Sequence, residues 1–211
     1  MIGRTTLMGL VVAWPCVAAA GSATASSELV ERDGTKHPAS AAVDGLLTTA
    51  WAEAEMGTGE GAWIEVRLDR ATDITSVSLW PGDLRRGERS LKENGRPHTV
   101  TVQLLDGSQV VAEQEVRVRD GAEQGEQRVD VPIAGTARSV KVRIDQAYAG
   151  FLYNDTYVSE IAVNFLEGAP EVPALEAWKA SRTGTRAAEA HEEAVIDRFG
   201  RITADTLGDR E

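Results

Sequence analysis

Hydrophobic and polar residues alternate in short runs across the middle of the chain. The runs cover residues 63–68, 74–80, 99–105, 110–119, 128–131, 139–144 and 158–165. A period of two with many β-branched residues is typical of half-buried strands. Asp106-Gly107, Asp120-Gly121 and Gly135 separate the runs as turn signals, and Pro132 is expected to end one of them. Since no helical period lies between the runs, the pattern predicts an all-β jelly-roll β-sandwich rather than a parallel α/β fold.

The N-terminus has a different composition. Residues 1–25 are typical of a signal peptide, with Arg4 as its positive charge, an apolar stretch over residues 7–20, and small residues 23–25 before Ser26. We therefore expect cleavage before Ser26 and a secreted or periplasmic protein.

Two alternatives for this segment stay open, an uncleaved anchor and lipidation. Pro15 interrupts the apolar stretch, which is short for a membrane span, so no span is expected after cleavage. Trp14 and Pro15 are bulky residues before Cys16, and they disfavour lipidation there. Cys16 is the only cysteine, so the cleaved protein has no disulfide, thiol nucleophile or cysteine-based zinc site.

The composition also changes after Phe165. Gly168, Pro170 and Pro173 indicate a linker, and the sequence beyond them is rich in Ala, Glu and Arg. Apolar residues at helical spacing near the C-terminus complete the prediction that 166–211 is a linker and helical tail. The predicted organisation is therefore a signal peptide (1–25), a jelly-roll domain (26–165) and this tail.

The net charge of −11 narrows the range of partners. It disfavours nucleic acid and anionic membranes, because both repel an acidic surface.

Motifs for catalysis are not found in the sequence. His37, His98 and His191 have no metal-ligand spacing, and there is no Gly-x-Ser-x-Gly motif. No pair of carboxylates is marked out for glycoside hydrolysis. The glycine-rich residues 57–61 lack the lysine and the helix of a phosphate-binding loop. We therefore predict that the protein is not an enzyme.

Three stretches carry a resemblance to a known family: residues 42–65, with Asp44-Gly45 and Thr49-Ala50-Trp51; residues 94–100; and residues 147–161, which end in Ser159-Glu160-Ile161. Together they resemble the discoidin-like, coagulation factor type C superfamily of galactose-binding jelly rolls. More narrowly, they are similar to the NAD glycohydrolase translocation domain, also called the NADase-type glycan-binding domain. The likeness covers about residues 26–165 and does not imply a hydrolase. At residues 80–83 this chain has Trp-Pro-Gly-Asp where the narrow family carries Asn-Gly-Tyr.

The ligand-binding candidates come from two long loops, residues 81–97 and 147–157. If the strands 74–80 and 99–105 are antiparallel neighbours, the first loop lies at one end of the sandwich, and the resemblance puts the second loop there too. Sugars are bound by an aromatic platform beside hydrogen-bonding side chains. The candidates are Trp80, Arg86, Asn94, Arg96, Tyr148, Tyr153 and Asp155. Core packing of the aromatic residues, solvation of the arginines, and a structural Arg96–Asp155 pair are the alternatives.

A metal site is also expected from the resemblance. In related type C modules the first loop and a glutamate near the C-terminal strand share a structural calcium, and the matching residues here are Asp44, Thr49 and Glu160. Calcium takes oxygen ligands of this kind. The alternative is that Asp44 only caps its loop through backbone N–H groups.

Together these features predict a secreted, non-catalytic module that binds carbohydrate or a cell-surface glycan through loops 81–97 and 147–157. The alternative is a protein-interaction or scaffold domain that acts through its helical tail, where a protein partner would dock.

Overall fold

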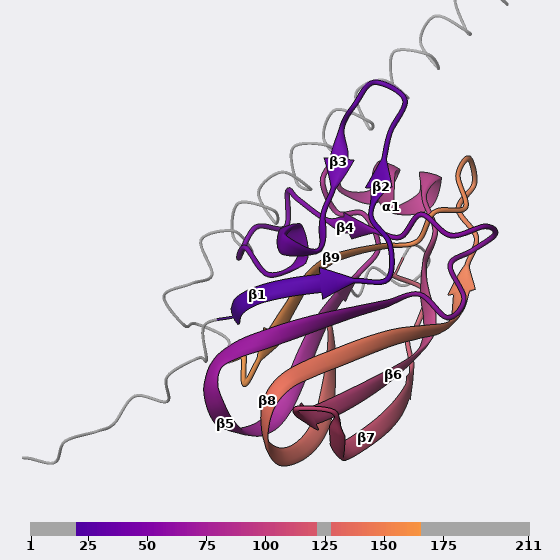
Figure 1. The fold of residues 1–211 in the computed structure, drawn as a ribbon. Helices are drawn as coiled ribbons and strands as arrows, with labels where there is room; N and C mark the ends of the chain where they lie inside the picture. The colour runs from indigo at the N-terminus through magenta and orange to yellow at the C-terminus, as the bar shows by residue number, and fades with distance from the viewer. Residues whose placement is uncertain (1–19, 122–127, 166–211) are drawn as a thin grey trace, which may run out of the picture.

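The alternating runs fold into antiparallel strands in the computed structural model, which describes residues 20–121 and 128–165 (Figure 1). Residues Ala39–Ala42 form a short 3₁₀ helix, η1. The elements in chain order are β1 (Ala20–Ala25), β2 (Leu29–Val30), β3 (Lys36–His37), η1 (Ala39–Ala42), β4 (Trp51–Ala52), β5 (Trp63–Pro81), α1 (Glu88–Glu93), β6 (Arg96–Asp106), β7 (Gln109–Arg117), β8 (Val129–Tyr148) and β9 (Tyr157–Val163).

Two long strands, β5 and β8, bend and belong to both layers of the sandwich. The first half of β5 pairs with β1 and with the second half of β8, whereas its second half pairs with β9 and with the first half of β8. One layer is therefore built from β1, β5, β8, β6 and β7, and the other from β4, β9, β5 and β8. This confirms the predicted β-sandwich.

The bends explain two errors in the predicted strand boundaries. The runs 63–68 and 74–80 are one strand, and β8 continues through Pro132 and Gly135. The register of β5 and β8 shifts between Ile74 and Ser76, opposite this segment. A local irregularity of this kind accommodates a proline that has no N–H to donate to the ladder.

The core fills the space between the two layers. Ile64 and Val66 point inward from β5 while Glu65 points outward, and Val140, Val142 and other inward residues of β8 face the same core. Burying each such side chain contributes about 1.5–3 kcal/mol. This core holds the strands rigidly and leaves the loops at their ends free to form a site.

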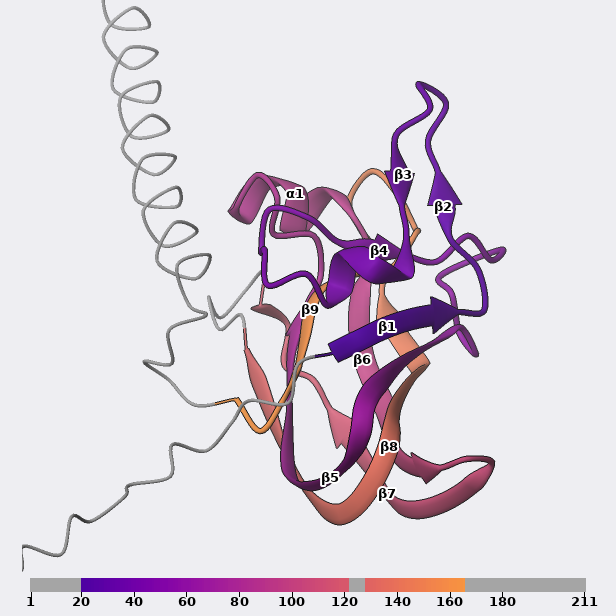
Figure 2. The same ribbon diagram turned by 60° about the vertical axis from the view of Figure 1, so that its left-hand side comes forward.

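The two ends of the sandwich differ. Hairpin β2–β3, α1 and the loop after β8 lie at one end, whereas the bends of β5 and β8 lie at the other (Figures 1 and 2). Strands 74–80 and 99–105 are not neighbours, because β6 pairs with β7 and β8. Loop 81–97 instead crosses between the layers and contains α1. It still meets the loop after β8, since Gly95 forms a bridge with Thr156.

Strand β1 lies within the segment assigned to the signal peptide. Its residues pair antiparallel with residues 64–68 of β5, and Ala23 and Ala25 pack against the core. Cleavage before Ser26 would remove this strand.

The linker and helical tail at 166–211, and the protein interaction assigned to them, lie outside the described residues. Within residues 20–121 and 128–165, no helix is long and apolar enough to cross a membrane.

Candidate functional site

A groove of about 750 Å³ lies at the end of the sandwich that carries hairpin β2–β3. The hairpin contributes residues 29–33 to one wall. The segment around α1 contributes Arg85, Arg86 and Asn94, and the segment after β8 contributes Tyr153, Asp155 and Tyr157. Three stretches far apart in the sequence therefore form one concave surface with aromatic, aliphatic and charged groups.

Backbone hydrogen bonds fix the loop after β8 against the C-terminal end of α1. Phe151 N donates to Lys92 O at 2.8 Å, and Tyr153 N donates to Glu93 O at 2.9 Å. Gly150 lies so close to this turn that a Cβ atom there would be 2.4 Å from Glu93 O. Only glycine fits this approach. The loop therefore presents Tyr153 to the groove in a defined position.

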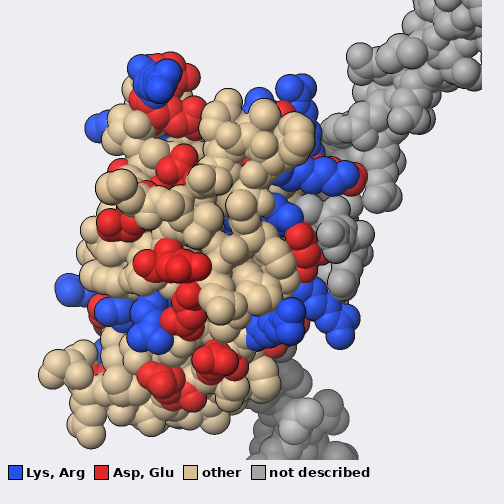
Figure 3. Space-filling model, turned by 90° about the vertical axis from the view of Figure 1, so that its right-hand side faces the viewer, with Lys and Arg blue, Asp and Glu red and all other residues tan. Residues whose placement is uncertain are grey.

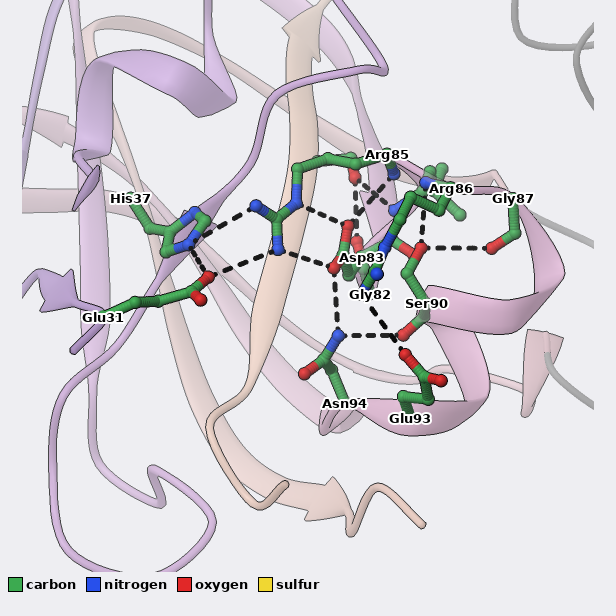
Figure 4. A network of polar contacts seen from close by, with 12 residues as sticks. Glu31, His37, Gly82, Asp83, Arg85, Arg86, Gly87, Ser90, Glu93 and Asn94 are labelled. Carbon is green, nitrogen blue, oxygen red and sulfur yellow. Dashed lines mark hydrogen bonds and ion pairs between the residues drawn. The ribbon is translucent and has the colours of Figure 1, made fainter. Parts of the chain in front are cut away.

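Asp83 is fully buried and organises the floor of the groove (Figure 4). Its carboxylate accepts hydrogen bonds from Arg85 Nε and Arg85 Nη2, both at 2.9 Å, and from Asn94 Nδ2 at 2.9 Å. Burial alone would lower the pKa of the Arg85 guanidinium, but the hydrogen bonds and charge of Asp83 outweigh burial, and the pKa is raised. Arg85 is thus a fixed cation, oriented by a bidentate partner.

The hairpin is tied to this floor through Glu31. Its carboxylate lies 2.6 Å from His37 Nε2 and 3.7 Å from Arg85 Nη2. His37 packs edge-on against Tyr157 with ring centroids 5.1 Å apart, and Arg85 lies 5.4 Å from the centre of the same ring. Burial raises the pKa of the Tyr157 hydroxyl, so it stays protonated. Charge pairs and ring contacts therefore hold the wall in place.

Four of the predicted ligand-binding residues meet at the groove: Arg86, Asn94, Tyr153 and Asp155. Tyr153 is 55% exposed and offers a ring to a ligand. Arg86 pairs with Glu93 at 3.2 Å, yet its side chain stays 60% exposed. These residues combine the aromatic surface and polar groups from which sugar sites are built.

The prediction that Trp80 contacts a ligand is wrong. Its side chain is 3% exposed and packs with Leu47, Leu84 and Leu91 in a second hydrophobic cluster. Phe165 meets it edge-on at 5.1 Å. Loops 44–50 and 81–95 cover the face of the sheet on which Trp80 lies. The ring therefore stabilises these loops from below.

Arg96 and Tyr148 were also predicted to bind the ligand, but neither residue lines the groove. Arg96 pairs with Asp120, with Nε and Nη2 at 2.6 and 2.5 Å from its two carboxylate oxygens. Tyr148 donates its hydroxyl to Val118 O at 3.2 Å and packs edge-on against His98. The alternative that Arg96 forms a structural ion pair is therefore correct, but its partner is Asp120 and not Asp155.

The three residues expected to hold a metal lie near one another. Asp44 accepts hydrogen bonds from Thr49 Oγ1 at 2.8 Å and from Leu46 N at 2.9 Å, and Glu160 accepts one from Gly45 N at 3.1 Å. Burial, and secondarily the charge of Asp44, raises the pKa of Glu160 to about 8. Within the described ranges, no group of three or more His, Cys, Asp or Glu side chains is arranged for a metal ion.

The residues present nevertheless fit a hard cation. Two carboxylates and the Thr49 hydroxyl lie together with the Leu46 carbonyl, which is 2.9 Å from Thr49 Oγ1. All of these are oxygen donors of the kind that calcium prefers, and calcium does not need three acidic side chains. A positive charge here would also relieve the repulsion between the two carboxylates.

Sequence reasoning missed the hairpin wall and Asp83. The hairpin has a signal that could have been used, since Asp33-Gly34 lies between short strand-like runs and Gly34 closes a three-residue loop, with Glu31 N donating to Thr35 O at 2.8 Å. Asp33 Oδ1 accepts from Thr35 N at 2.9 Å, as such turns often show. Asp83 had no comparable signal, because its burial follows only from the way in which α1 folds over it.

Solved structures with the same fold are carbohydrate-binding modules. The family 32 module of NanJ from C. perfringens, solved with galactose, is 21% identical, covers 70% of this chain and 97% of its own, and has a TM-score of 0.51. CpGH89CBM32-5 from Clostridium perfringens, solved with GalNAc-β-1,3-galactose, is 20% identical, covers 70% and 99%, and has a TM-score of 0.55. At these identities the likeness shows the fold alone.

The search among curated proteins finds no match. The family described as the NAD glycohydrolase translocation F5/8 type C domain matches residues 14–164, which span the whole described sandwich, and the chain therefore belongs to this family.

Proposed function

We propose that this protein is a secreted, non-catalytic module that binds a glycan in the groove between hairpin β2–β3 and the loops 81–97 and 147–157. The observation that carries the proposal is the convergence of Arg86, Asn94, Tyr153 and Asp155 on one concave surface. The half-exposed ring of Tyr153 would stack on the C–H face of a sugar, while the other three side chains would hydrogen-bond its hydroxyl groups.

The fold gives independent support. The NanJ module was solved with galactose, and CpGH89CBM32-5 was solved with GalNAc-β-1,3-galactose. The groove is proposed to bind without hydrolysis, because the sequence marks out no pair of carboxylates for that reaction. Incubation of candidate glycans with the protein should therefore release no product.

A glycan array followed by calorimetry on the full chain tests the proposal. Arg86→Ala should weaken a detected interaction by about tenfold, since it removes a charged hydrogen-bond donor. Arg138→Ala is the matched control, because Arg138 has a similarly exposed side chain (63%) but pairs with Asp106 at the opposite end of the sandwich. No binding of any glycan at millimolar concentration would overturn the proposal.

Tyr153→Ala should abolish the interaction, since the aromatic platform is lost. Its matched control is Phe151→Ala, because Phe151 is an aromatic residue of the same loop, 86% exposed, that does not line the groove. Equal losses in the two variants would show that the loop, not the groove, carries the binding.

We also propose that Asp44, Thr49 and Glu160 hold a structural calcium that braces loop 44–50 against β9. The raised pKa of Glu160 supports this, since an unpaired buried carboxylate is costly and a cation would stabilise its charged form. A chelator should lower the melting temperature, and added calcium should restore it. Identical melting curves with and without chelator would exclude the ion.

Export is proposed from the N-terminal segment, with cleavage after Ala20, at the start of β1, rather than before Ser26. Removal of Ala20–Ala25 would strip a paired strand from β5 and uncover Ile64 and Val66 beneath it. The small residues Ala18-Ala19-Ala20 offer a cleavage site upstream of most of β1. The mass of the exported protein decides between the two positions.

A further inference from the structure

Among residues 20–121 and 128–165, no group donates a hydrogen bond to the side-chain oxygen of Asn94. Asn94 Nδ2 donates to Asp83 Oδ2 at 2.9 Å and to Ser90 O at 3.0 Å, and both of these partners are acceptors. The orientation of the amide is therefore determined, and Oδ1 points away from the network (Figure 4). Asn94 lines the groove, so the group that it offers to a ligand is a hydrogen-bond acceptor.

Asp155 adds a second acceptor beside it. Gly95 N donates to Asp155 O at 3.0 Å, so the segments that carry Asn94 and Asp155 run side by side. Within the part of the chain that the structure describes, the Asp155 carboxylate receives no hydrogen bond or ion pair. Behind it, the buried carboxyl of Glu53 accepts from Thr156 N at 2.8 Å.

The arginines of the groove are already compensated. Asp83 binds Arg85 through Nε and Nη2, and Nη2 also lies 3.7 Å from Glu31 Oε1. The remaining nitrogen, Nη1, lies 3.5 Å from His37 Nε2 (Figure 4). Arg86 is paired with Glu93. Arg32 and Asp33 also line the groove, at the exposed hairpin tip, and contribute charges of opposite sign. Each cation of the groove therefore has an acidic neighbour, whereas Asp155 forms no ion pair within the described residues.

Building on the proposed function, we infer that the groove selects neutral sugars and rejects sugars that carry a carboxylate. Two hydroxyl groups of a neutral sugar would donate to Asn94 Oδ1 and to the Asp155 carboxylate, while its apolar face would rest on Tyr153. A uronic or sialic acid would instead bring a second negative charge to Asp155, and like charges at an interface are strongly unfavourable.

The charge of the wider surface also disfavours the binding of anionic glycans. Acidic side chains run down the middle of the face shown in Figure 3, and lysine and arginine side chains lie mainly at its margins. The chain as a whole carries a net charge of −11. An anionic glycan would thus be repelled before it reaches the groove.

Matched sugar pairs on the full chain test this inference. Galactose and galacturonic acid, and glucose and glucuronic acid, each differ only at C6, where a hydroxymethyl group is replaced by a carboxylate. In calorimetry or ligand-detected NMR at neutral pH, at least one neutral member should bind about tenfold more tightly than its acid, because one charge repulsion is worth about that factor.

Asp155→Asn should remove the discrimination, since it keeps the shape and an acceptor but not the charge. The acid sugar should gain affinity relative to the neutral sugar, whose own affinity should fall because a charged acceptor becomes a neutral one. Asp106→Asn, at the opposite end of the sandwich, should leave both affinities unchanged. Because no hydrogen bond within the described structure depends on the Asp155 carboxylate, the melting temperature should be unaltered.

The outcomes separate the two proposals. Tighter binding of the acids, or unchanged discrimination in Asp155→Asn, overturns the neutral-sugar inference and leaves glycan binding standing. Binding of neither class overturns the proposed function and the inference together.

Discussion

Two arginine–aspartate ion pairs lie near the same end of the sandwich and have different structural roles. Asp83 and Arg85 are two residues apart and lie in the floor of the groove, where Asp83 also binds Asn94. Arg96 and Asp120 are separated by 24 positions and join the start of β6 to the segment after β7. The geometry of the two ion pairs is similar. What differs is the third partner, a groove residue in one case and the Tyr148 ring in the other.

The comparison shows that an arginine in a binding loop is not by itself a ligand contact. Arg96 was a candidate because of its loop and its neighbours. Two of its guanidinium nitrogens are hydrogen-bonded to Asp120, however, and the guanidinium group lies over the Tyr148 ring. Arg85 shapes the site without having a free edge. Arg86, the most exposed of the three, is the one left to reach a ligand.

Asp83→Ala should cause the largest loss. It leaves the half-buried Arg85 charge and the buried Asn94 amide without their partner, so the free energy of unfolding should fall by about 3–5 kcal/mol. Urea unfolding measures this, with the exposed Asp106→Ala as control. Glycan affinity should be lost too. A variant with normal affinity would contradict the organising role of Asp83.

Arg96→Met should cost less, about 2 kcal/mol, because both Arg96 and Asp120 keep some contact with water. Its methionine preserves the packing of the side-chain stem against Tyr148. The free energy of unfolding should fall while glycan affinity stays unchanged. A marked loss of affinity in the folded variant would place Arg96 back in the binding site.

Glu160 extends the comparison to a buried carboxylate that no arginine compensates. Its pKa of about 8 lies above the ordinary value of 4.5, so between these values the folded state holds a proton that the unfolded state has released. Without calcium, stability should therefore fall as pH rises, by about 1.4 kcal/mol between pH 6 and 7. Glu160→Gln should flatten this dependence in thermal melts. An equal slope in both proteins would assign it to another group.

Glu31→Gln should have the smallest effect on stability, under about 1 kcal/mol, because the amide can still hydrogen-bond to His37 and the Glu31–Arg85 contact is long and partly exposed. The variant also weakens the tie between hairpin β2–β3 and the floor, so we expect a modest drop in glycan affinity. An unchanged affinity would mean that the hairpin wall does not contribute to binding.

Much of the fold could be predicted from the sequence because it follows from local patterns. Alternation identified every long strand, and Asp106-Gly107 correctly marked the turn between β6 and β7. The predictions that failed concern long-range strand pairing. Residues 63–68 and 74–80 form one bent strand, and strands that are consecutive in the chain do not all pair. Such pairing depends on the register of β8, which no local pattern contains.

The candidate site was predicted only in part for a similar reason. Residue type and loop membership were enough to find Asn94, Tyr153 and Asp155. They could not show that Trp80 lies under two loops, since burial depends on which segments fold over a strand. Nor could they find Asp83, because its carboxylate has a role only once α1 brings Asn94 and Arg85 around it.

The placement of the two ends of the sandwich has a consequence for how the domain is presented. The first residue of β1, Ala20, pairs with Leu68, and the last residue of β9, Val163, pairs with Val77, so both strands end beside the bend of β5. The groove opens at the opposite pole. A carrier protein, a sensor chip or a bead would therefore be best joined at the pole away from the groove.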